Sequence, residues 1–128
     1  MVGTSFHTLT PCRIVDTRNP AGPLGGPSLT GGASRTFVVI NQCFLPATAK
    51  AIAVNIAETG AQGSGNLKVY PGGTSAPSAS TINFSVGQTR SNNAVVPLGA
   101  SGDISVFAAI GSGLQVDFIL DIVGYFAP

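Results

Sequence analysis

Short stretches of alternating apolar and polar residues recur along this chain, and clusters of Gly, Pro, Ser and Asn separate them. In the 51–58 segment, for example, Ile52, Val54 and Ile56 fall on one side of an extended backbone. A repeat of two residues is the period of a β-strand with one buried face. Helix formers gather only in 46–51, which is one turn at most. The pattern therefore predicts an all-β protein.

Eight segments carry this strand pattern. They are 12–17, 35–40, 51–58, 66–70, 81–86, 93–98, 103–108 and 116–124. The inward faces expected besides that of 51–58 are Ile82, Phe84 and Val86, and Val116, Phe118, Leu120 and Ile122. The glycine-rich segments 99–102 and 111–113 are expected to be hairpin connections. Eight short strands favour an antiparallel two-sheet β-sandwich, of jelly-roll or other Greek-key topology, in one domain spanning 1–128.

Charged residues are scarce, and this excludes several classes of function. They make up 9% of the 128 residues, with a net charge of +1, against about 25% in an average soluble domain. A chain that is 44% hydrophobic is not a disordered tail. A net charge near zero argues against nucleic-acid partners and anionic membranes. No apolar run reaches about 18 residues, so no membrane insertion is expected, and residues 1–5 lack the features of a signal peptide.

The chain has two cysteines, Cys12 and Cys43. Their spacing matches neither a zinc site nor a Cys-x-x-Cys redox motif. A disulfide between them is the interpretation we favour, because the composition resembles that of secreted domains. Two buried free thiols are the alternative.

Candidate catalytic and metal-binding residues are few. His7 is the one histidine, and no sequence signal sets a nucleophile or a carboxylate beside it. Asp117 and Asp121 share a strand face but lie about 13 Å apart, too far for a glycosidase pair. A calcium site built from Asp16, Asn19 and loop carbonyls has no Asp-x-Asp-x-Asp loop to support it. We therefore expect no enzyme, no cofactor and no metal.

Asp16 is the most informative polar residue. It shares a face with Cys12 and Ile14, so it follows them toward buried surface. A buried carboxylate needs a cation and hydrogen bonds, and Arg18 and Arg90 are the available cations. Their group, with the amides of Asn92 and Asn93, is predicted to be a structural ion pair or, alternatively, a polar ligand pocket.

Several segments resemble a family of all-β modules that is repeated in large secreted and surface proteins of environmental bacteria. They are LTPCRIVDTR at 9–18, LPATAKA at 45–51, NLKVYP at 66–71, STINF at 80–84, GQTRSNN at 87–93 and DIVGYF at 121–126. The resemblance covers nearly the whole chain. It implies an extracellular module, it strengthens the expectation of a Cys12–Cys43 disulfide, and it transfers no catalytic residue.

Two functions remain open from the sequence. The scarcity of charge favours a non-catalytic structural or adhesive module, outside the cell or on its surface, that self-associates into a homo-oligomer or filament. The alternative is a carbohydrate-binding, lectin-like module that holds a neutral glycan through the polar residues around Asp16, Arg90 and Asn92.

Overall fold

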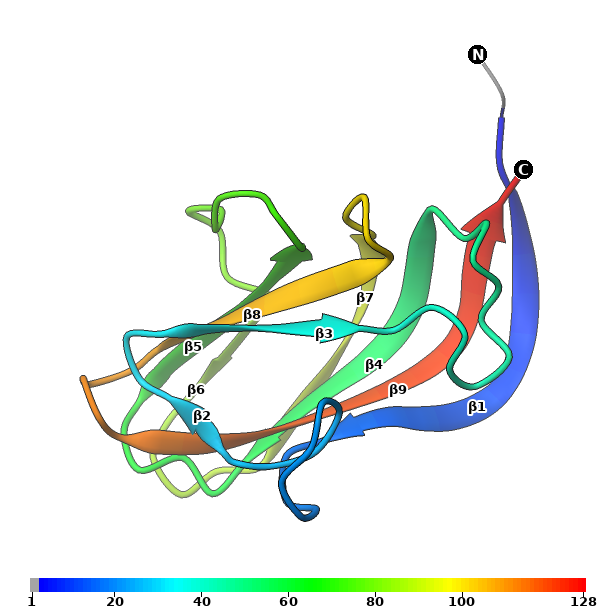
Figure 1. Ribbon diagram of the computed structural model, residues 1–128. Coiled ribbons are helices and arrows are strands. Elements are labelled where there is room, and N and C mark those ends of the chain that lie inside the picture. Colours follow the sequence, from blue (N-terminus) through cyan, green and yellow to red (C-terminus); the bar gives the residue numbers. More distant parts are fainter. Residues whose placement is uncertain (1–2) are drawn as a thin grey trace.

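The computed structural model describes residues 3–128, which form two antiparallel β-sheets (Figure 1). The strands are β1 (Ser5–Asp16), β2 (Leu29–Thr30), β3 (Ser34–Val38), β4 (Ala51–Thr59), β5 (Gly65–Pro71), β6 (Ile82–Phe84), β7 (Arg90–Pro97), β8 (Asp103–Ala109) and β9 (Gln115–Ala127). The five-stranded sheet has the order β1–β9–β4–β7, with β2 also paired to β9. The four-stranded sheet has the order β3–β8–β5–β6. The predicted all-β, two-sheet arrangement is confirmed, and jelly-roll topology stays a prediction.

The chain changes sheet at almost every step from β3 onward. Only β5 and β6 are consecutive strands that also pair with each other in this part of the chain. The 99–102 segment joins β7 to β8, and 111–113 joins β8 to β9, so each connects strands of different sheets. The hairpin prediction for these two segments was therefore wrong. Glycine-rich turns reverse the chain locally, but the packing of the sheets decides where the next strand pairs.

Strand ends differ from the predicted ones where pairing, rather than hydrophobicity, sets them. β1 begins at Ser5 because its mostly exposed first half pairs with the end of β9, from Ser5 opposite Ala127. β6 ends at Phe84, which lies opposite the first residue of β5, Gly65. Val86 therefore falls beyond the strand and is 58% exposed, not inward as predicted. The two-residue strand β2 was not predicted, because it is too short to carry a repeat.

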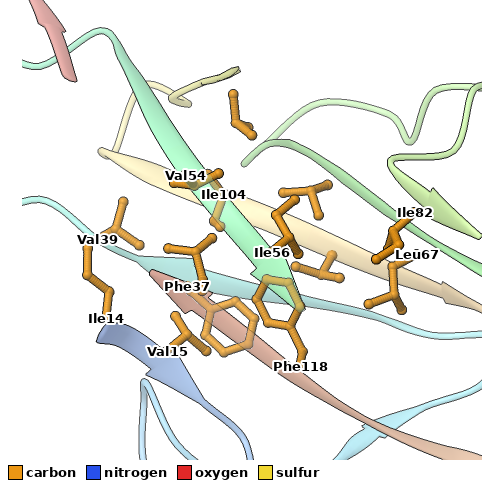
Figure 2. Packing of buried hydrophobic residues seen from close by; sticks show 14 of the residues in the cluster. Ile14, Val15, Phe37, Val39, Val54, Ile56, Leu67, Ile82, Ile104 and Phe118 are labelled. Carbon is orange, nitrogen blue, oxygen red and sulfur yellow. The ribbon is translucent and has the colours of Figure 1, made fainter. Parts of the chain in front are cut away.

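The core lies between the sheets and uses the predicted inward faces of β4 and β9. Ile52, Val54 and Ile56 are buried, as are Val116, Phe118, Leu120 and Ile122. Phe118 on β9 stacks on Phe37 of β3, with ring centroids 5.8 Å apart (Figure 2). This contact joins the two sheets, because β3 and β9 belong to different ones.

The 39–50 connection between β3 and β4 covers one end of the core, on the right of Figure 1. Val39, Leu45 and Ala49 in this connection are buried against the core. A disulfide ties Cys43 in the same connection to Cys12 of β1, with a Cα–Cα distance of 5.9 Å. The disulfide prediction is thus confirmed. Crosslinking residues that are 31 apart disfavours the unfolded chain by about 3–4 kcal/mol in the loop-entropy model.

Phe118→Ala is expected to lower the free energy of unfolding by about 3–5 kcal/mol, because it leaves a cavity between the sheets. The control is Val86→Ala at the exposed turn, for which we expect a change within about 0.5 kcal/mol. Both values can be measured by urea denaturation of the oxidised protein. A Phe118→Ala loss no larger than that of the control would contradict this description of the core.

Candidate functional site

Asp16 is buried at the end of β1 and is held by Arg18. A register shift between Arg13 and Val15 turns Val15 to the core side, opposite Leu120, and places Asp16 opposite Ile119. Asp16 is buried, as expected, but it lies on the other side of the strand from Cys12, so the prediction that the two share a face was wrong. Nε and Nη2 of Arg18 donate to the two carboxylate oxygens, each at 2.9 Å. These hydrogen bonds hold the pKa of Asp16 below its usual value, although burial acts in the opposite direction. The carboxylate is therefore paired within the molecule, as a structural ion pair requires.

Arg90, Asn92 and Asn93 lie on β7, and this strand is at the opposite edge of the sheet from β1. Arg90 is therefore not among the partners of Asp16 in the described chain, and the predicted group divides in two. Local sequence gave no signal for this separation, because it depends on which strands stand between β1 and β7. The register places Arg90 opposite Glu58 of β4 instead.

The two edge strands β6 and β7 enclose a polar groove of about 360 Å³. Its lining is Thr81, Ile82, Asn83, Arg90, Ser91 and Asn92. Nδ2 of Asn92 donates to the carbonyl oxygen of Thr81 at 3.1 Å and so joins the two sheet edges. The groove presents amide, hydroxyl and guanidinium groups, which are the groups that hydrogen-bond to sugar hydroxyls.

Glu58 is a buried charge that the sequence reasoning missed. It stands two residues after Ile56, so the alternation of β4 directs it to the core face, and it is fully buried. Neither carboxylate oxygen has a hydrogen-bond partner within residues 3–128. Burial raises the pKa of Glu58, and the neighbouring Arg90 opposes this more weakly. The period-2 pattern that identified Ile52, Val54 and Ile56 could have identified Glu58 too.

The side of the five-stranded sheet that points away from the other sheet is named here the outer sheet face. It carries Arg13 of β1; Ala53, Asn55 and Ala57 of β4; Ser91, Asn93 and Val95 of β7; and Asp121 and Val123 of β9. Arg13 lies opposite Asp121, Asp121 opposite Asn55, and Asn55 opposite Asn93, which makes a polar row across four strands. On one side of this row, Val95 and Val123 are 60% and 38% exposed. They help to line a mainly apolar hollow of about 580 Å³, with Ala53, Val54, Asn93 and Ala94.

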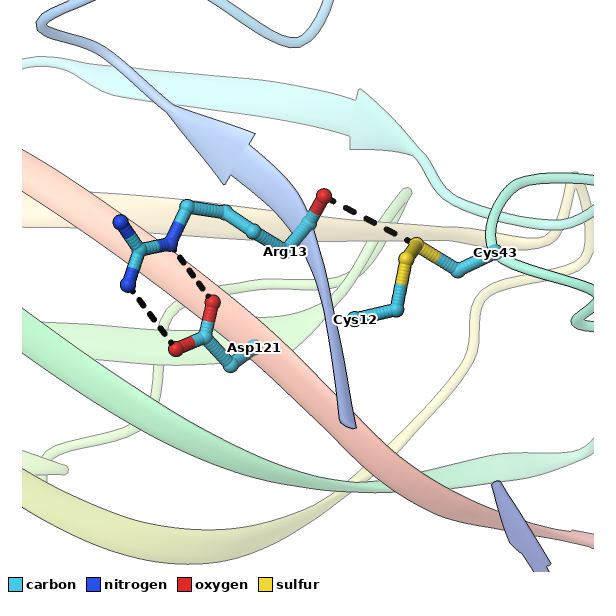
Figure 3. The surroundings of a disulfide bond; sticks show 4 residues. All are labelled: Cys12, Arg13, Cys43 and Asp121. Atoms are coloured by element: carbon cyan, nitrogen blue, oxygen red, sulfur yellow. Dashed lines mark hydrogen bonds and ion pairs between the residues drawn. A yellow bond between two sulfur atoms is a disulfide. The ribbon is translucent and has the colours of Figure 1, made fainter. Parts of the chain in front are cut away.

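The charged members of the outer sheet face neutralise each other. Nε and Nη2 of Arg13 donate to the two oxygens of Asp121 at 2.8 and 3.2 Å (Figure 3). Cys12, the residue before Arg13, extends to the other side of β1, toward Cys43. The outer sheet face therefore presents the Arg13–Asp121 pair among Ala, Val, Ser and Asn side chains, and at its β1 edge Nη1 of Arg13 also lies 3.8 Å from a carboxylate oxygen of Asp16.

Other charged side chains also bind within the molecule. Asp117 accepts hydrogen bonds from the hydroxyls of Thr17 and Ser28, at 2.8 and 2.7 Å. The guanidinium of Arg35 donates to carbonyl oxygens of the 22–27 loop and lies 4.7 Å from the centre of the Phe37 ring. Burial lowers the pKa of Arg35 below its ordinary value. These contacts fix loops to the sandwich and give half-buried charged groups hydrogen-bond partners within the molecule.

His7, the one histidine, packs against an aromatic ring. His7 lies opposite Tyr125 on β9 and stacks on its ring, with centroids 4.9 Å apart. In the described part of the chain, no three His, Cys, Asp or Glu side chains are arranged to hold a metal ion. Residues 3–128 also contain no helix long and apolar enough to cross a membrane.

Glu58→Gln is expected to stabilise the protein at neutral pH and to flatten the dependence of its stability on pH. A carboxyl whose pKa is raised in the folded state stabilises the fold at pH values below 4.5, the ordinary pKa of a glutamate. This contribution is lost as the pH rises through the pKa of the folded state. The difference in unfolding free energy between variant and wild type should therefore grow in favour of the variant from pH 4 upward. Urea titrations at several pH values measure it, and a difference that is constant with pH would contradict the buried, unpartnered carboxyl.

Comparison with known proteins does not identify the chain, because no family model and no curated protein sequence matches it.

Proposed function

We propose that this protein is a non-catalytic, extracellular structural or adhesive module that self-associates into a homo-oligomer or filament. The observation that carries the proposal is the outer sheet face, which exposes apolar and amide side chains around charged groups that are paired within the molecule, Arg13 with Asp121 and Asp16. Burying such a face against another copy removes no unpaired charge from water. The cost of desolvation is therefore small.

The charge distribution of the whole chain supports the same proposal. Asp16, Asp117 and Arg35 are bound by other groups of the same molecule. Like-charge repulsion between copies, which keeps many soluble proteins apart, is correspondingly weak at a net charge of +1. Apolar contact and hydrogen bonds between amides are then the main forces available for association.

The Cys12–Cys43 disulfide supports an extracellular or cell-surface location. Disulfides form and persist in oxidising compartments and are rare in reducing ones. The resemblance to modules of bacterial surface proteins, carried by segments such as 9–18 and 121–126, points to the same location.

The wild-type protein is expected to form particles heavier than its 12.8 kDa monomer at micromolar concentration. Static light scattering over a dilution series measures the mass, and negative-stain microscopy distinguishes closed oligomers from filaments. Because the proposed contact is uncharged, association should persist in about 1 M salt, where the Debye length is about 3 Å. A monomer at every concentration would refute self-association.

Carbohydrate binding is the second candidate, and the groove between β6 and β7 is the observation that favours it. Arg90, Asn83 and Asn92 supply donors and acceptors there, and such groups recognise the hydroxyls of neutral sugars. The groove has little exposed aromatic surface on which a sugar ring could stack, so hydrogen bonds would carry the affinity.

On this second candidate, Arg90→Ala is expected to weaken binding of a glycan selected on an array about 10-fold, because it removes a charged donor. Lys50→Ala is the matched control, since it removes one positive charge outside the groove. Titration calorimetry of the selected glycan measures both variants. The absence of any bound glycan, or equal affinity in the two variants, would eliminate this candidate.

A further inference from the structure

Phe44 is the most exposed large hydrophobic side chain in the described chain, at 94%. It lies in the 39–50 connection, directly before Leu45, which is buried in the core. The two neighbouring apolar residues therefore have opposite environments. The fold anchors the connection through Leu45 and leaves the ring of Phe44 in water.

The backbone around Phe44 holds this arrangement in a conformation that bulky residues rarely adopt. Asn41, Cys43 and Phe44 have φ angles of 65°, 51° and 63°, in the left-handed region where Asn is tolerated but Phe is uncommon. Hydrogen bonds from the N–H of Asn41 to the carbonyl of Leu45, and from the N–H of Leu45 to that of Gln42, close the turn. The Cys12–Cys43 disulfide fixes it to β1. An exposed aromatic ring on a strained, crosslinked turn is a pre-organised contact, and such strain concentrates at functional positions.

The hollow on the outer sheet face has the complementary character. It is open to solvent, and it is bordered by Ala53, Asn93, Val95 and Val123 without a charged side chain in its lining. The residues around Phe44 are also uncharged, since Thr8, Leu9, Thr10, Pro11 and Cys12 flank it. Contact between the two surfaces would bury the ring of Phe44 and the exposed valines while leaving no charge unpaired.

The two surfaces lie on opposite sides of the five-stranded sheet. Cys12, to which the Phe44 turn is tied, lies opposite the core-facing Ile122, whereas Val95 and Val123 belong to the outer sheet face. One molecule therefore cannot bring its own Phe44 to its own hollow. A contact between such different patches is heterologous, and it leaves a free Phe44 at one end and a free hollow at the other.

We propose that Phe44 of one copy inserts into the outer-face hollow of a second copy and so propagates a head-to-tail assembly. This contact rests on the proposed self-association and specifies its partner, which is the same chain. Exposed aromatic anchors that enter a pocket are the residues that dominate interface energies.

Two variants test the contact from its two sides. Phe44→Asn removes the ring and keeps a residue that tolerates a positive φ, so the turn is expected to fold. Val95→Glu places a charge in the hollow at an already exposed position. Each variant alone is expected to raise the concentration for half-assembly about 10-fold or more. The matched control is Val86→Asn, another exposed apolar residue outside both surfaces, which should assemble like wild type.

Mixing the two variants gives the sharpest result. The intact Phe44 of the Val95→Glu chain can enter the intact hollow of the Phe44→Asn chain, and neither remaining surface can continue the assembly. At a concentration where each variant alone is monomeric, an equimolar mixture should therefore contain a 1:1 heterodimer in native mass spectrometry and light scattering. Thermal melts establish that each variant folds, and Val123→Lys replaces Val95→Glu if that variant does not.

Other outcomes separate this contact from self-association itself. If Phe44→Asn assembles as well as the wild type, the Phe44 contact is overturned, whereas self-association itself is still supported. Val95→Glu alone could form a discrete dimer that is lost when Phe44→Asn is added to the same chain. That result would mean that two Phe44 turns pack against each other, and it would overturn the head-to-tail geometry. A monomeric wild type at all concentrations would remove both proposals.

Discussion

The packing of β9 against the opposite sheet is the contact on which most of the structure depends. β9 pairs with β1, β2 and β4, so it stands in the middle of the larger sheet. Its inward residues Phe118, Leu120 and Ile122 are fully buried, and Phe118 meets Phe37 of the other sheet. Burial of each such side chain contributes about 1.5–3 kcal/mol. The register that this burial imposes on β9 also sets which residues face outward.

The outer sheet face is a consequence of that register. With Leu120 and Ile122 directed inward, Asp121 must point outward, where Arg13 of the neighbouring strand binds it. The same alternation on β4 leaves Ala53 and Asn55 outside. A face of this kind is stable in water, because alanine and asparagine cost little to expose. It is equally easy to cover, because it gives up few strong contacts with water.

Two residues, Glu58 and Phe44, lower the stability of the fold, and only one of them has a complementary surface elsewhere on the molecule. Glu58 is a carboxyl buried without a hydrogen-bond partner among residues 3–128, and such a group destabilises the fold at neutral pH. Phe44 combines an unfavourable backbone conformation with an exposed ring. For Glu58 the compensation within the described chain is weak, because the neighbouring Arg90 only partly opposes the effect of burial. For Phe44 the structure offers a complementary surface, the outer-face hollow, which only the Phe44 of another copy can reach.

The sequence by itself determined the all-β class and the inward faces of the 51–58 and 116–124 segments. These are local properties, since the alternation of side chains along an extended backbone requires no knowledge of its neighbours. Only the tertiary structure decided that Arg90 lies far across the sheet from Asp16, that Glu58 faces Arg90, and that Phe44 is exposed beside a buried Leu45. Those outcomes depend on which strands pair and how the two sheets close over one core. Strand order is set by contacts between residues distant in sequence, and no local repeat records them.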